Sequence, residues 1–177
     1  MKNKLTKLEF KWICYDMGNS AFILLVATIL PIYFNYLSSS QGVAEYNYLS
    51  YWSYAASIST LIVALAGPIL GTLADYKDHK KKIFLTTAML GALALACFWI
   101  PSSWFAFLVL FIAAKVAYSL SLIVYDSMLT DITTEDRMDA VSSKGYAWGY
   151  IGSVVPFIIS LVFVLMYDKM GMTLKAA

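Results

Sequence analysis

The sequence is poor in the residues on which soluble enzymes and secreted domains depend. Of its 177 residues one is histidine, two are cysteine and 14% are charged, against about 25% charged in soluble domains. The shortage of cysteine excludes a disulfide-rich secreted mini-protein, and the composition excludes a disordered chain and a nucleic-acid-binding domain. It contains no phosphate-binding loop, Gly-x-Ser-x-Gly elbow or His-Glu-x-x-His helix, so we do not expect an enzyme.

In place of charge the sequence has long apolar runs. Apolar residues make up 60% of the chain, and the mean hydropathy is +0.69. A bilayer core needs about 20 helical residues to be crossed. Five segments meet that length with at most one charge each: 12–36, 51–74, 83–100, 104–125 and 145–167. They show no strict alternation, and helices satisfy their own backbone groups in lipid. The sequence therefore predicts an all-α integral membrane protein.

The loops between these runs set the expected orientation. Ten Lys or Arg residues fall on one side of the five runs and two on the other. Cytoplasmic loops carry an excess of Lys and Arg, so we expect the N-terminus and the loops 75–82 and 126–144 on the cytoplasmic side. The first apolar run is too long for a signal peptide and no small-residue cleavage site follows it. This absence of a targeting peptide suits a bacterial inner membrane.

A motif follows the second run, where small residues, one acid and a basic cluster meet. It resembles the loop motif of the major facilitator superfamily, Gly-x-Leu-Ala-Asp-Arg-x-Gly-Arg-Arg/Lys, at these positions: Gly71, Leu73, Ala74, Asp75, Lys80 and Lys81. The sequence departs from the motif at Tyr76, Asp78 and His79. In that family the aspartate is thought to latch the two halves of the transporter, so the resemblance implies a conformational latch. A positively charged topogenic loop with an incidental acid is the alternative.

Two further stretches resemble the vacuole-effluxer-like branch of this superfamily. The first is Tyr15-Asp16-Met17-Gly18-Asn19-Ser20-Ala21, and the second runs from Tyr125-Asp126 to Gly149-Tyr150-Ile151-Gly152. Fungal members of that branch are associated with amino-acid export from the vacuole. The resemblance implies a secondary transporter that moves small polar solutes, amino acids among them, by alternating access, with proton coupling as a further expectation.

Lys115 is the one charge in the fourth run and lies near its middle, hence near the bilayer midplane. Placing a lysine there costs roughly 2.5–3.5 kcal/mol on insertion scales, and ionisable residues inside membranes usually mark function. We expect Lys115 to line a substrate or proton pathway. The alternative is a lysine that snorkels and is satisfied by Tyr118 and Ser119.

Three polar residues complete the candidate pathway. Asp16 lies about one turn inside the first run, Asn19 lies one turn further along the same stripe, and Asp126 ends the fourth run. Asp126 is about 16 Å from Lys115 along the helix, which is too far for contact. We therefore expect a direct or water-mediated contact between Lys115 and Asp16, which either exchanges a proton during transport or neutralises a buried charge.

The fifth run carries small residues and a proline: Gly145, Gly149, Gly152 and Pro156. The Gly-x-x-x-Gly spacing lets helices approach closely. Close packing is the favoured interpretation, and a hinge that bends during alternating access is the alternative.

The chain offers five spans, whereas transporters of this superfamily have two halves of six helices each. Residues 168–177 look like the connection into a sixth span. We expect the chain to be the N-terminal part of such a transporter, with the lipid bilayer, a small-molecule solute, a proton and the missing C-terminal half as partners, and with no cofactor, metal or nucleic acid. The alternative is a non-transporting five-span membrane protein that acts as a scaffold or partner subunit.

Overall fold

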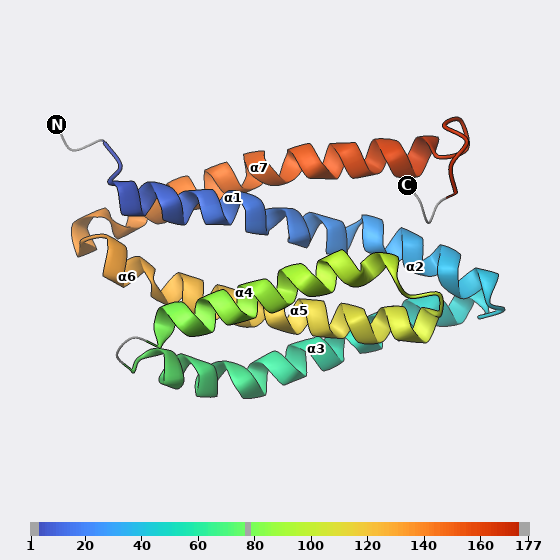
Figure 1. Cartoon of the computed structure of the whole chain (residues 1–177), viewed down its shortest axis with the longest axis horizontal. Coiled ribbons are helices and arrows are strands. Elements are labelled where there is room, and N and C mark those ends of the chain that lie inside the picture. The colour runs from blue at the N-terminus through green and yellow to red at the C-terminus, as the bar shows by residue number, and fades with distance from the viewer. Residues whose placement is uncertain (1–3, 77–78, 174–177) are drawn as a thin grey trace. The chain divides into compact units, whose positions relative to one another are not determined.

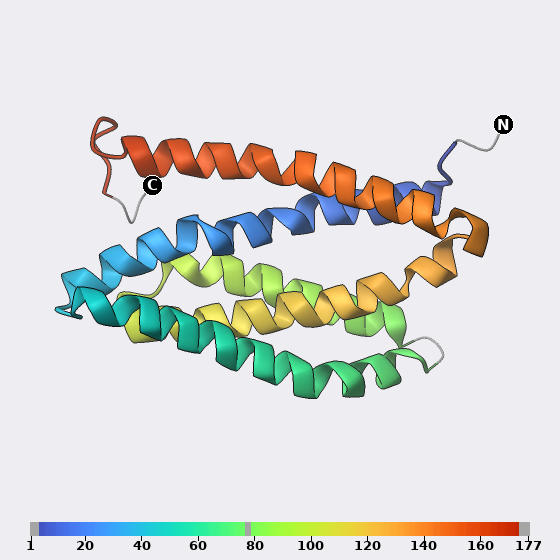
Figure 2. The same cartoon turned by 180° about the vertical axis from the view of Figure 1, so that it is seen from behind.

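The computed structural model describes residues 4–76 and 79–173. Within those ranges every regular element is helical (Figures 1 and 2). The elements are α1 (Lys7–Ala27), α2 (Ile29–Ser40), α3 (Glu45–Ala74), α4 (Lys80–Ala96), η1 (Cys97–Trp99), α5 (Trp104–Ser127), α6 (Leu129–Ile132), η2 (Glu135–Arg137) and α7 (Met138–Met166). Five helical segments are long and apolar enough to cross a membrane: Lys7–Ser40, Tyr46–Ala74, Lys80–Trp99, Trp104–Ile132 and Glu135–Met166. The predicted all-α membrane fold is confirmed.

The surfaces of these helices also suit lipid. Large apolar side chains are exposed along α3 and α7, with Leu65 at 67% and Leu165 at 70% of their full exposure. Soluble monomers rarely expose apolar patches of more than a few hundred Å². In a bilayer the same side chains face a solvent as apolar as themselves.

The first candidate span is interrupted where α1 gives way to α2. Thr28 leaves the helical conformation, with φ −130° and ψ −65°. Pro31 explains the position of the break, because proline lacks an N–H group and its ring clashes with the carbonyl four residues earlier, that of Ala27. The Thr28 hydroxyl and N–H instead donate to the carbonyls of Leu24 and Leu25. The segment 12–36 is therefore not the single unbroken helix that its hydropathy suggests.

By its contacts the chain divides into two compact units. Unit 1 comprises Met1–Tyr33 and Leu129–Ala177, and unit 2 comprises Phe34–Met128. In unit 1, α1 and α7 lie side by side and run parallel, because Trp12 faces Gly145 and Met17 faces Gly152 (Figure 1). Unit 1 thus joins the two ends of the described chain through one long helix pair.

Unit 2 is a bundle of consecutive helices around α5. Helix α4 runs antiparallel to α5, whereas α3 runs parallel to it (Figure 2). The parallel direction follows because Trp52 stacks on Phe111 and, further along both helices, Gly67 faces Ile123. An aromatic cluster forms the core at one end: the side chains of Phe34, Phe107 and Phe111 are completely buried. Ring centroids of Trp52 and Phe111 are 4.2 Å apart.

Candidate functional site

Helix α1 carries a small polar cluster in unit 1, made by Asp16, Asn19 and Ser20. The Ser20 hydroxyl lies 3.5 Å from Asp16 Oδ1, which is long for an O–H···O hydrogen bond. The Nδ2 atom of Asn19 is buried, and no described residue accepts a hydrogen bond from it. Buried polar groups are normally paired, so this cluster has hydrogen-bonding capacity left over at the depth of a candidate membrane span.

The glycines of α7 lie against this cluster. A Cβ atom at Gly149 would stand 2.7 Å from Ser20 Oγ and 3.0 Å from Asp16 Oδ2, and one at Gly152 would stand 2.8 Å from the Met17 carbonyl oxygen. These distances are shorter than van der Waals contact, so only glycine lets the α7 backbone approach α1 this closely. The structure therefore brings Asp16 together with Gly145 and Gly149, and Met17 together with Gly152, a pairing of helices that was not foreseen from the sequence.

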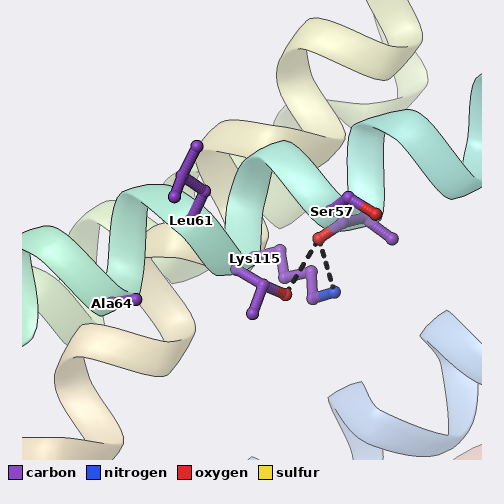
Figure 3. Close-up of a pocket in the computed structure, with 6 residues that line it drawn as sticks. Ser57, Leu61, Ala64 and Lys115 are labelled. Carbon is purple, nitrogen blue, oxygen red and sulfur yellow. Dashed lines mark hydrogen bonds between the residues drawn. The ribbon is translucent and has the colours of Figure 1, made fainter.

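Lys115 forms the second polar feature, which lies in unit 2. Its Nζ atom donates to the Ala56 carbonyl of α3 at 3.3 Å, and the Thr60 hydroxyl donates to the same oxygen at 2.9 Å. An open pocket of about 480 Å³ surrounds them, lined by Ala56, Ser57, Thr60, Leu61, Ala64 and Lys115 (Figure 3). Lys115 thus reaches across to α3, and among described residues neither Tyr118 nor Ser119 accepts a hydrogen bond from its amine.

The remaining expectations concern the contact between Asp16 and Lys115 and the positions of Asp126 and Pro156. Asp16 belongs to unit 1 and Lys115 to unit 2, and their contact stays a prediction. Asp126 is exposed in the last turn of α5. Pro156 lies within the continuous helix α7, and its role as a hinge also stays a prediction.

The latch motif covers the end of α3 and the start of α4. Asp75 is the C-cap of α3, and its backbone N–H donates to the Gly71 carbonyl at 3.2 Å. Lys80 opens α4, and its Nζ atom lies 3.4 Å from the Ser127 carbonyl at the C-terminal end of α5. Lys81 is exposed in the same turn. With the described residues the Asp75 side chain makes no hydrogen bond or ion pair; Asp78 lies outside them.

An ion pair at the start of α1 was missed from the sequence. Glu9, only 1% exposed, receives hydrogen bonds from Arg137 Nε at 2.9 Å and Nη2 at 2.8 Å, from the Thr133 hydroxyl at 2.7 Å and from the Thr6 backbone N–H at 2.7 Å. Arg137 also donates to the Lys4 carbonyl. A two-point pairing of this kind is among the stronger polar contacts in proteins. Its signal was the capping box formed by Thr6 and Glu9.

Comparison with known proteins places the chain in a family of transporters. The family model described as vacuole effluxer Atg22 like matches residues 6–138. A curated relative from Bacillus subtilis (strain 168), described as the uncharacterized MFS-type transporter YxiO, is 39% identical over 170 residues, which cover 94% of this chain and 40% of the relative. No solved structure matches the chain. The chain belongs to the vacuole effluxer Atg22-like family, as its motifs had indicated.

The curated relative is described as a transporter. The chain spans about two-fifths of the length of the curated relative.

Proposed function

We propose that this chain is the N-terminal part of a secondary transporter that moves small polar solutes, amino acids among them, by alternating access coupled to protons. The observation that carries the proposal is the presence of Asp16 and Lys115 inside helices long enough to span a bilayer. Ionisable side chains are costly at that depth and usually mark the path of a solute or ion.

In this proposal Asp16 binds and releases the proton. Its carboxylate lies against the glycine face of α7, where a small shift between the two helices changes its surroundings. Asn19 supplies a nearby polar group, and Lys115 provides the opposite charge that Asp16 contacts in one state of the cycle. Asp126 lies at the exit of the pathway.

The remaining motif residues serve the conformational change. Gly71, Asp75, Lys80 and Lys81 form the latch, and the contact of Lys80 with the end of α5 ties the loop to that helix. Pro156 allows α7 to bend. The proposal also places the N-terminus on the cytoplasmic side of a bacterial inner membrane, because the basic residues gather there.

The test begins with the DNA downstream of codon 177. An open frame with about seven more spans provides the complete gene product, which is reconstituted into liposomes with an imposed pH gradient. We expect the gradient to drive amino-acid accumulation, and Asp16→Asn to abolish this coupling. Asp168→Asn, an exposed acid in the turn after α7, is the matched control.

Two results would count against the proposal. Proton-coupled uptake that is unchanged in both Lys115→Ala and Asp16→Asn would remove the proposed pathway. A genuine stop codon would favour the non-transporting scaffold or partner subunit instead.

A further inference from the structure

Lys115 is a cation whose pocket contains no acid. The six lining residues offer two hydroxyl groups, from Ser57 and Thr60, and three apolar side chains, from Ala56, Leu61 and Ala64. Figure 3 shows the lysine side chain extended beside α3 with its amino group next to the Ala56 carbonyl. Among the described residues of unit 2, no acid forms an ion pair with this positive charge, which is surrounded by hydroxyl and methyl groups.

The one acceptor that the lysine has among the described residues is already in use. A carbonyl oxygen has two lone pairs. Inside a helix one of them accepts the N–H four residues later, and the Thr60 hydroxyl donates to the Ala56 carbonyl as well. Lys115 is therefore a third donor to this oxygen, at the longer distance of 3.3 Å. An ammonium group has three N–H donors, so this contact leaves most of its bonding capacity for another partner.

We infer that this pocket binds the carboxylate group of a small organic solute, with Lys115 as its ion-pair partner. The inference rests on the proposed function, since the solute is the one the transporter moves. Ser57 and Thr60 line the same pocket as the amine, and their hydroxyls can rotate to donate to the carboxylate oxygens. Leu61 and Ala64 continue the pocket on the same helix and offer an apolar surface to the rest of the solute.

Charge and size both favour this chemistry. One lysine balances one negative charge, so a monocarboxylate leaves the occupied pocket neutral, whereas a doubly charged phosphate leaves it negative. The cavity of about 480 Å³ falls within the range of about 300–1,000 Å³ that is usual for small-molecule sites. In this assignment Lys115 stays protonated and binds the solute directly, and it takes no part in proton exchange.

The test uses two probes of nearly equal shape, 4-methylpentanoate and 4-methylpentanamide, which differ in the charge of the terminal group. Binding to the purified 177-residue chain in phosphatidylcholine nanodiscs is followed by saturation-transfer difference NMR. We expect the carboxylate to bind at least about tenfold more tightly than the amide. Lys115→Met keeps the length of the side chain and removes this preference, whereas Lys115→Arg keeps it.

Lys169→Met is the matched control, because Lys169 is an exposed lysine in the turn after α7 and should leave the preference intact. Circular dichroism confirms that each variant keeps its helices. Equal binding of the two probes, no binding of either, or a preference that survives in Lys115→Met would each overturn the inference.

The binding test is separate from the transport assay. Carboxylate preference in a complete protein that does not transport would overturn the proposed function and leave the pocket standing. Proton-coupled transport by a protein without that preference would overturn the inference that the pocket binds a carboxylate, and it would leave the proposed function standing.

Discussion

The two units hold their helices together in opposite ways. In unit 1, α1 and α7 are far apart in the sequence and approach through glycines, with Glu9 and Arg137 joined at one end. In unit 2, α3, α4 and α5 follow one another in the chain (Figure 1). Large aromatic rings pack between them, Trp52 on Phe111 and Phe84 on Tyr125. Close packing of the helices in unit 1 requires glycine, which has no side chain, whereas packing in unit 2 requires large aromatic side chains. An added atom should therefore harm unit 1, and a removed atom should harm unit 2.

The largest effect is expected from removing volume in unit 2. Phe111 is completely buried and stacks on Trp52. Phe111→Ala should lower the free energy of unfolding by about 3–5 kcal/mol, because the cavity it leaves loses packing contacts. The measurement is SDS-induced unfolding of the micelle-bound chain, followed by circular dichroism.

Phe105→Ala provides the matched control on the same helix. Phe105 is 63% exposed, so its removal should change the stability little. Equal losses in the two variants would show that burial inside unit 2 does not set its stability.

The next effect tests unit 1 by adding atoms. A Cβ at Gly152 would stand 2.8 Å from the carbonyl oxygen of Met17 and 3.1 Å from its Cα, and backbone atoms cannot rotate away. Gly152→Val should force α7 away from α1 and cost about 2–3 kcal/mol. The same SDS titration measures it, with cross-linking between cysteines introduced on the two helices as a readout of their separation.

Gly91→Ala is the control from unit 2. A Cβ at Gly91 meets the backbone nitrogen of Tyr118 at 3.6 Å, which is ordinary van der Waals contact. If Gly152→Val were as well tolerated as Gly91→Ala, the close approach of α1 and α7 would not be needed for packing.

The smallest effect concerns the ion pair of unit 1. Glu9→Gln keeps the shape of the side chain but removes the charge that Arg137 contacts. We expect the midpoint of thermal unfolding to fall by only about 2–4 °C. The Arg137 side chain is partly exposed, so water can replace part of the interaction that it loses with Glu9. Glu135→Gln, an exposed acid of η2 near the same network, should shift the midpoint less. Equal shifts would mean that the pairing with Arg137 adds nothing to stability.

The sequence predicted the elements of this fold better than their partners. The apolar runs, the family motifs and the glycine stripe of α7 are periodic or local, so they can be read along one stretch of chain. The break at Thr28 also had a local signal in the sequence, Pro31. A count of apolar residues does not detect it, because a single proline hardly changes the mean hydropathy of the run.

Contacts between distant elements were harder to predict. The contact of Asp16 with Gly149 joins the polar stripe of α1 to the glycine stripe of α7. Each stripe can be recognised in the sequence, but neither indicates that the other is its partner. Lys115 finds a main-chain carbonyl on α3, and every residue carries such a group, so the sequence cannot single out Ala56.

The pairing of Glu9 with Arg137 also has a consequence for synthesis. The two residues are 128 positions apart. At about 5–20 residues per second the ribosome needs roughly 6–26 s to pass from one to the other. During that interval the first helix has been made and its partner α7 has not, whereas α3, α4 and α5 are completed in sequence. The nascent chain can therefore assemble its aromatic bundle before Arg137, which is made just ahead of α7, supplies the ion-pair partner of Glu9.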